Sequence, residues 1–164
     1  MMVFLALPAL QRSQRDTQRK NDLSRVMTAI ANYSAANRGN LPTAAWTNVN
    51  WQTRFVNLYL SSNGDQFLDP AGNATAGDGV SVAVAPLPPT YVINQNVDAV
   101  ALPAADQVFN PTVNQNAIYP TLGAVCDIAA ANAGNGGQVT LLQGSRKIAF
   151  RMPLEGGGVY CLSN

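Results

Sequence analysis

The sequence predicts an α+β protein in which a long N-terminal helix packs on a small antiparallel β-sheet. Apolar residues recur at helical spacing from Leu23 to Tyr33, which indicates a helix with one buried face. Apolar and polar residues alternate in Lys147–Pro153 near the C-terminus, which indicates a strand. A helix followed by strands in a chain of 164 residues favours one α+β domain with an appendage.

The composition is that of a globular chain with little charge. Only 12% of the residues are charged, about half of the usual share, and the formal net charge is +1. The net charge is too small to attract nucleic acid electrostatically, and we predict no specific nucleic-acid partner. The chain has no histidine, which removes the commonest general base and the commonest metal ligand. We predict no catalytic residue, no cofactor and no enzyme activity.

The first ten residues, Met1–Leu10, carry no polar side chain. As a helix they reach about 15 Å, whereas crossing a bilayer takes about 20 apolar residues. They are either an interfacial helix or the end of a longer apolar helix. We favour the second interpretation, because a short isolated apolar end has nothing to bury itself against. Pro8 predicts a kink or local unwinding in this helix.

The next segment, Gln11–Asp22, has no apolar residue and holds much of the positive charge of the chain. Half of the ten basic residues lie in or just after it: Arg12, Arg15, Arg19, Lys20 and Arg25. Asp16 and Asp22 stand between them, and the pairs Asp16–Lys20 and Asp22–Arg25 have the spacing of helical ion pairs. A solvated, salt-paired helix face is the favoured interpretation, and a basic patch for a partner is the alternative.

The amphipathic part of the helix, Leu23–Ala36, is predicted to support the globular part. Gly39 is a natural C-cap, and Pro42 forces the residue before it into extended chain. We therefore expect residues 1–22 to protrude. Residues 23–164 would form a globular head, with residues 23–38 as its helical spine.

A second, short helix is predicted over Trp51–Leu60, with Asn50 as its cap. Aromatic residues beside it (Trp46, Trp51 and Tyr59) are expected in the core rather than in a binding groove. Strand candidates follow at Val80–Val84, Thr90–Asn94, Ala117–Val125, Val139–Leu142, Lys147–Pro153 and Val159–Leu162. The last two are expected to form an antiparallel hairpin, with Ile148, Phe150 and Met152 on one face of the first strand.

Three aspartates in one glycine-containing stretch, Asp65, Asp69 and Asp78, raise the question of a calcium site. Their spacing lacks the alternating ligands and the final bidentate glutamate of such loops, so turn formation is favoured and no metal site is predicted. The two cysteines, Cys126 and Cys161, predict one disulfide in an oxidising compartment, with a pair of buried thiols as the alternative.

Several of these features together resemble the type IV pilins and the related pseudopilins. The resemblance depends on four features: the apolar run with Pro8, the Gln/Arg-rich helix, the corner at Asn37–Pro42 and the turn at Asp69-Pro70. The last residues, Leu154–Asn164, are similar to the ending of a subgroup from reduced-genome bacteria in which an earlier cysteine pairs with the last one. Two features depart from the family pattern: Leu41 stands where tyrosine is common, and the processing motif Gly-Phe-Thr-x-x-Glu is absent.

The resemblance implies a pilin fold, with a C-terminal disulfide-bonded region. It also implies a structural role as a subunit that waits in the inner membrane and is stacked by an assembly machinery into an extracellular filament. The filament would serve attachment to a host-cell or abiotic surface, twitching motility or DNA uptake, and its partner would be the chain itself. The implied assembly helix contains Val3, Phe4, Leu5, Leu7, Pro8 and Leu10. Polar contacts between subunits are expected at Arg12, Arg15, Arg19 and Lys20.

Two other functions remain open at the level of sequence. A pseudopilin of a type II secretion or competence apparatus would form only short periplasmic assemblies. A secreted adhesin or binding module would carry the helix incidentally. A processing motif and further apolar residues upstream of Met1 would favour pilins and pseudopilins, whereas a cleaved secretory signal would favour the adhesin.

Overall fold

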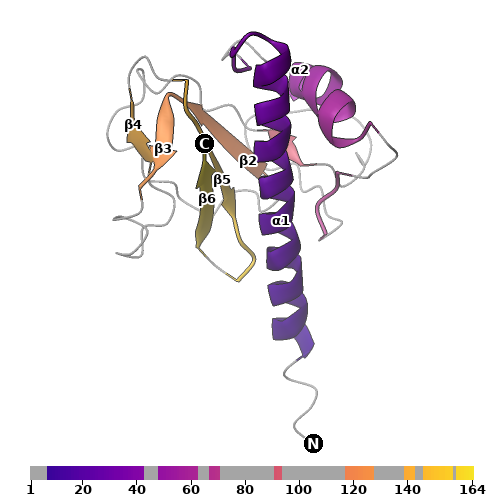
Figure 1. The fold of residues 1–164 in the computed structure, drawn as a ribbon. Helices are drawn as coiled ribbons and strands as arrows, with labels where there is room; N and C mark the ends of the chain where they lie inside the picture. The colour runs from indigo at the N-terminus through magenta and orange to yellow at the C-terminus, as the bar shows by residue number, and fades with distance from the viewer. Residues whose placement is uncertain are drawn as a thin grey trace, which may run out of the picture.

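The computed structural model describes residues 7–42, 48–62, 67–70, 91–93, 117–127, 139–142, 146–156 and 158–164. One long helix lies against a small β-sheet, and a shorter helical segment packs beside its C-terminal half (Figure 1). The predicted α+β class is confirmed.

The long helix, α1, spans Leu7–Ala36 and is about 45 Å long at the usual helical rise. Pro8 lies in its first turn, where a missing amide hydrogen removes no helical hydrogen bond. The segment before Leu7, with the predicted bend, lies outside the described residues. At the other end the Gly39 N–H donates to the Ser34 carbonyl over 2.7 Å. The left-handed exit begins at Arg38 (φ 57°), one residue before the predicted Gly39 (φ 80°).

The second helical segment begins as α2, Asn48–Trp51, and continues as the π-helix η1, Gln52–Leu60. The predicted helix is confirmed, but it starts before Asn50, so Asn50 is not its cap. The Ser61 N–H donates to the Val56 carbonyl over 2.8 Å, five residues back along the chain. Such wide turns are rare and often occur at functional sites.

The larger sheet has the strand order β1-β2-β5-β6, and two further strands, β3 and β4, pair separately. Their bounds are β1 Val92–Ile93, β2 Ala117–Leu122, β3 Ala124–Cys126, β4 Val139–Leu141, β5 Ile148–Pro153 and β6 Val159–Ser163. The expectation of a purely antiparallel sheet is wrong at one edge, because β1 pairs with β2 in parallel. The other pairings are antiparallel, including the predicted β5–β6 hairpin. The strand predicted at Val80–Val84 lies outside the described residues.

The predicted strand Ala117–Val125 is divided at Gly123, which has a φ of 64°. The Gly123 N–H donates to the Lys147 carbonyl over 2.7 Å, and its own carbonyl accepts from the Leu142 N–H over 2.6 Å. A glycine adopts this left-handed conformation without steric cost. The chain therefore leaves β2 and enters β3 without a loop.

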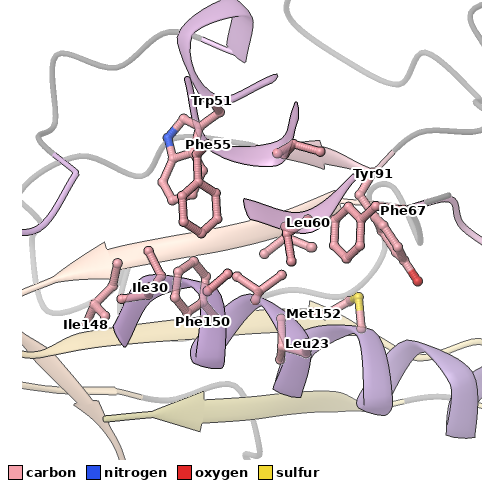
Figure 2. Close-up of a cluster of buried hydrophobic side chains, with 14 residues drawn as sticks. Leu23, Ile30, Trp51, Phe55, Leu60, Phe67, Tyr91, Ile148, Phe150 and Met152 are labelled. Atoms are coloured by element: carbon pink, nitrogen blue, oxygen red, sulfur yellow. The ribbon is translucent and has the colours of Figure 1, made fainter. Parts of the chain in front are cut away.

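The core lies between α1, the second helical segment and β5. Figure 2 shows Trp51 and Phe55 pointing from the second helical segment toward Phe150 of β5. The Trp51 ring meets Phe55 edge-on at 5.1 Å and Phe150 at 6.2 Å, so the prediction that Trp51 is a core residue is confirmed. Trp46 lies outside the described residues, and Tyr59 packs at the border of the core.

Strand β5 is buried on both faces, whereas its alternation predicted one buried face. The predicted face, which includes Ile148, Phe150 and Met152, does line the main core. On the other face Ala149 joins a small cluster with β3 and β4, and Arg151 is fully buried. The second face is covered because β3 contacts β5 and β6, and Val139 of β4 joins the same small cluster. The local sequence pattern does not show this cover.

Candidate functional site

The inner face of α1 changes its chemical character halfway along. Asp16, Arg19, Leu23, Val26 and Ile30 follow one another at intervals of three or four residues, and all five are buried. The ionic residues therefore continue the apolar stripe toward the N-terminus. They connect α1 to the head through a set of partners that we call the polar seam: Arg15, Asp16, Arg19, Asp22, Asp69, Tyr91 and Glu155.

The centre of the polar seam is a two-pronged ion pair between Arg19 and Asp69. Arg19 Nε lies 2.8 Å from Asp69 Oδ1, and Arg19 Nη2 lies 3.0 Å from Asp69 Oδ2. The exposed fractions are 0% for Arg19 and 4% for Asp69. Burial lowers the pKa of Arg19, but the hydrogen bonds and charge of Asp69, together with the charges of Glu155 and Tyr91, raise it by more, so the net shift is upward. Bidentate pairs of this kind are stronger and more specific in geometry than single hydrogen bonds between neutral groups.

The N-terminal end of the seam fixes the β5–β6 turn to the helix. The Asp16 carboxylate accepts hydrogen bonds from the backbone N–H groups of Glu155 and Gly156, each over 2.8 Å. The Glu155 carboxylate lies 2.7 Å from Arg15 Nε and 3.9 Å from Arg19 Nη2. A β-carbon at position 156 would lie 3.0 Å from Asp16 Oδ2, which leaves little room for a side chain there. Two successive backbone N–H groups form a small anion-binding site, and α1 supplies its anion.

The other end of the seam joins Asp22 to Tyr91. The Tyr91 hydroxyl donates to Asp22 Oδ2 over 2.8 Å, and Arg25 Nη1 lies 3.3 Å from Asp22 Oδ1. Burial raises the pKa of Asp22, and the hydrogen bond from Tyr91 and the charge of Arg25 offset this only in part. Burial and the neighbouring Asp22 raise the pKa of Tyr91. The neutral phenol is thus the form that the fold selects.

The two ion pairs predicted within the helix have different outcomes. The pair Asp22–Arg25 is confirmed. Asp16 has other partners than the predicted Lys20: the backbone of the β5–β6 turn and Arg19 Nη1 at 3.6 Å. The Lys20 amino group instead lies 5.6 Å from the centre of the Tyr160 ring.

The four basic residues predicted for contacts between subunits lie in unlike surroundings. Arg19 is inside the protein, so the expectation that it contacts another subunit is corrected: its charge is neutralised within the chain. Arg15 is half-buried and paired with Glu155. Arg12 and Lys20 are exposed. The prediction of a solvated helix face fails at Arg19, because this residue falls on the inner stripe.

The N-terminal end of α1 is free of the head. Positions 8–14 are all exposed, and the exposed fraction of Leu10 is 57%. In Figure 1 this end of the helix extends past the sheet. Of the predicted assembly residues, Leu7 begins α1 and Pro8 follows it, whereas Val3, Phe4 and Leu5 lie outside the described residues.

The head holds the helix from Arg15 onward, eight residues earlier than the expected start at residue 23. Searched across the described segments, the helices include none with both the length and the apolar character needed to cross a membrane.

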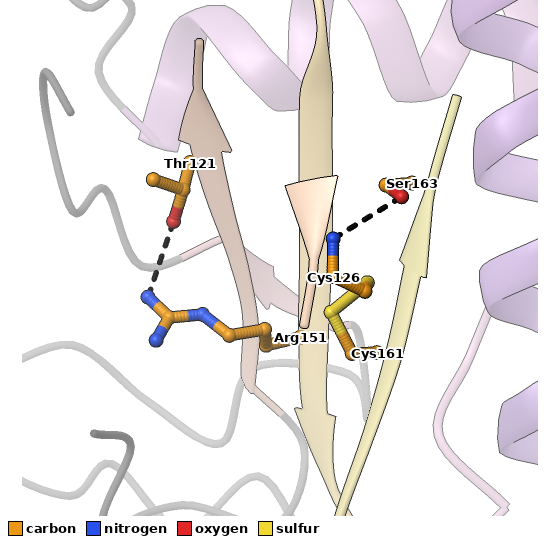
Figure 3. The surroundings of a disulfide bond; sticks show 5 residues. All are labelled: Thr121, Cys126, Arg151, Cys161 and Ser163. Carbon is orange, nitrogen blue, oxygen red and sulfur yellow. Dashed lines mark hydrogen bonds between the residues drawn. A yellow bond between two sulfur atoms is a disulfide. The ribbon is translucent and has the colours of Figure 1, made fainter. Parts of the chain in front are cut away.

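Cys126 and Cys161 form the predicted disulfide, with a Cα–Cα distance of 5.8 Å (Figure 3). The alternative of two buried thiols is wrong. The bond joins β3 to β6, and the Cys126 N–H donates to Ser163 Oγ beside it over 3.2 Å. It thereby connects the smaller pair of strands to the larger sheet.

Arg151 is a buried charge that the sequence does not predict. Its Nη2 donates to Thr121 Oγ1 over 3.1 Å across the β2–β5 pair (Figure 3). Burial lowers its pKa. Alternation along β5 places this residue on the face opposite Ile148, Phe150 and Met152.

The aspartates considered for calcium provide no site within the described part of the chain. Asp69 is engaged by Arg19, and Asp65 and Asp78 lie outside the described residues. Across the described ranges no three potential metal ligands lie together.

The polar seam contains residues that the sequence interpretation overlooked. The sequence pattern predicts Asp16 and Asp22 only as charges on a solvated helix face. The available signal was that Asp16 and Arg19 extend the spacing of Leu23, Val26 and Ile30 by two more positions. Tyr91 and Glu155 gave no such signal, because they reach the helix only through the folding of the chain.

Comparisons of the chain with protein-family models, with curated proteins and with solved structures return no match. What can be inferred about function therefore depends on the α+β fold, the disulfide and the way in which the polar seam holds α1.

Proposed function

We propose that the chain is the structural subunit of a type IV pilus, with a pilin fold that polymerises through α1 into an extracellular filament. The observation that supports this most is the division of α1. Positions 8–14 are exposed, whereas from Arg15 onward the helix is held by the head. A helical end free of its own head can pack against other copies, and the resemblance of the sequence to pilins points the same way.

The polar seam suits such a role because a filament needs every head at the same position on its helix. An apolar stripe can pack in more than one register. An ion pair forms only when its two residues lie opposite each other, so it fixes the head at one position along the helix. Specifying such a register is the best-attested role of buried polar groups. The register of the head on α1 would be fixed by the Arg19–Asp69 ion pair and by the hydrogen bonds between Asp16 and the β5–β6 turn.

Within this proposal the surface charges left for contacts between subunits are Arg12 and Lys20, since Arg19 is used inside the chain. The partners would be further copies of the chain and an assembly machinery in the inner membrane, where the subunit would wait before assembly. The filament would then serve attachment to a host-cell or abiotic surface, twitching motility or DNA uptake.

The test is electron microscopy of cells that carry the full gene, its deletion or a charge-reversed version. The variant Arg12→Glu/Lys20→Glu should abolish the filaments, while the melting temperature of the chain should stay unchanged, because both residues are exposed. Arg54→Glu is a matched control, because Arg54 is exposed on η1, away from the free helical end.

Filaments that persist without this protein would overturn the proposal. A block in secretion or transformation with no loss of surface fibres would favour a pseudopilin. Release of the chain as a soluble monomer would favour an adhesin.

A further inference from the structure

A groove of about 410 Å³ runs between α1 and the end of η1. Its lining comes from successive turns of α1 and from residues at or just after the end of η1: Asn21, Ser24, Arg25, Thr28, Ala29, Asn32, Tyr59, Leu60 and Ser62. The volume lies within the range of small-molecule sites. The groove lies apart from the N-terminal end of α1, so its occupant need not be another subunit.

The groove presents uncharged hydrogen-bonding groups. Asn21 and Asn32 are exposed, and in the part of the chain that the structure describes their amides form no hydrogen bond with the protein. Ser24 and Thr28 donate their hydroxyl hydrogens to backbone carbonyls one turn earlier, over 3.1 and 3.2 Å. Their oxygens keep lone pairs as acceptors, so this wall offers both donors and acceptors to a ligand.

Arg25, the one charged residue in the described part of the lining, is neutralised locally. Arg25 Nη1 lies 3.3 Å from Asp22, and its Nη2 donates to the Leu60 carbonyl over 3.4 Å. Among the described residues of the lining, none carries a carboxylate. A charged ligand would therefore lose hydration without gaining a counter-charge, which favours a neutral ligand.

The opposite wall carries an aromatic ring in a fixed position. Tyr59 stacks on Phe55 at 5.7 Å between ring centres and meets Tyr33 edge-on at 5.7 Å. The buried side chains of Ala29 and Leu60 are the apolar part of the lining. This wall is formed by the end of the π-helix η1. π-Helical turns are rare and occur frequently at functional sites.

We propose that this groove binds a neutral oligosaccharide. Sugar rings offer hydroxyl groups that both donate and accept, carry no charge, and present apolar C–H faces that pack on an aromatic ring. A peptide is less suited. Within the described segments no sheet edge lines the groove for strand addition, and its small apolar surface offers no deep pocket for the anchors of a docked helix.

The test uses the soluble chain, and it does not depend on filament formation. The chain is applied to an array of neutral and acidic glycans and of peptides, and binding is then measured by calorimetry with maltotetraose, cellotetraose and tetra-N-acetylchitotetraose. We expect binding to at least one neutral glycan. Asn21→Ala/Asn32→Ala should weaken it about tenfold, since each amide contributes about one hydrogen bond.

Two further variants separate binding from folding. Ser24→Trp should fill the groove and abolish binding, because Ser24 is exposed and outside the core. Gln18→Ala is the matched control on the same helix, since Gln18 is exposed but does not line the groove. The melting temperature of each variant shows that the fold is intact. Absence of binding to every neutral glycan, a preference for acidic glycans or peptides, or equal binding by Ser24→Trp would overturn the proposal.

Discussion

The two halves of the inner face of α1 hold the head in different ways. From Leu23 to Ile30 the face is apolar and packs on the aromatic core. From Asp16 to Asp22 it is ionic and pairs with the β5–β6 turn, Asp69 and Tyr91. Apolar burial stabilises in proportion to area and with little directionality. Buried ions add little net stability, but each needs its own partner. The helix therefore combines one half that provides stability with one half that fixes position.

The largest expected effect comes from removing a single buried charge in the ionic half. Arg19→Met should destabilise the fold by about 3–5 kcal/mol, because it leaves Asp69 buried without its counter-charge. Chemical denaturation measures this free energy. Arg12→Met is the matched control, and a change within about 0.5 kcal/mol is expected there because Arg12 is exposed.

The double variant Arg19→Met/Asp69→Leu sharpens the comparison. It should recover most of the lost stability, because two apolar side chains replace the ion pair. Spin labels at Ser13 and Lys147, which are both exposed, should then show a broader distance distribution. An equally narrow distribution would mean that the apolar half alone fixes the position of the helix.

In the apolar half, Leu23→Ala should destabilise by about 3 kcal/mol through lost burial and a residual cavity. This loss should be independent of pH, since no titratable group is removed. Denaturation at several pH values measures it. A loss that varied strongly with pH would show that the two halves are energetically coupled.

Tyr91→Phe tests the end of the seam at a smaller scale. The loss of one hydrogen bond to the buried Asp22 carboxylate should cost about 1–3 kcal/mol. Because the pKa of Tyr91 is raised, the wild type should also lose stability as the pH rises above 10.0, where the unfolded phenol ionises first. The variant should lack this alkaline loss, and thermal melts at rising pH compare the two.

The smallest effect is expected from the protonation of Asp22. The pKa of Asp22 in the folded state is raised above its ordinary value of 3.8. Between 3.8 and the folded-state pKa, the folded state therefore binds more protons than the unfolded state. Stability contributed by Asp22 should therefore rise as the pH falls toward 3.8. The unfolding free energy of wild type relative to Asp22→Asn measures this gain, and a difference that stays constant with pH would contradict it.

The parts of the fold that follow local rules could be predicted. The helix with its apolar face at Leu23–Tyr33, the β5–β6 hairpin and the disulfide are all found. Local spacing sufficed for the first two, and composition favoured the third. The candidate site was less predictable, because a charge in a polar run is normally solvated and nothing near Arg19 in sequence indicates Asp69.

The sequence by itself determined the α+β class, the two-sided character of the helix and the pairing of Cys126 with Cys161, because each depends on periodicity or composition. Only the tertiary structure decided that Asp16 and Arg19 face inward, that β5 is buried on both faces and that β1 pairs in parallel. The reason is physical. Whether a charge or an edge strand is buried depends on partners such as Asp69 and Glu155, which lie about 50 to 140 residues away and meet the helix only in the folded chain.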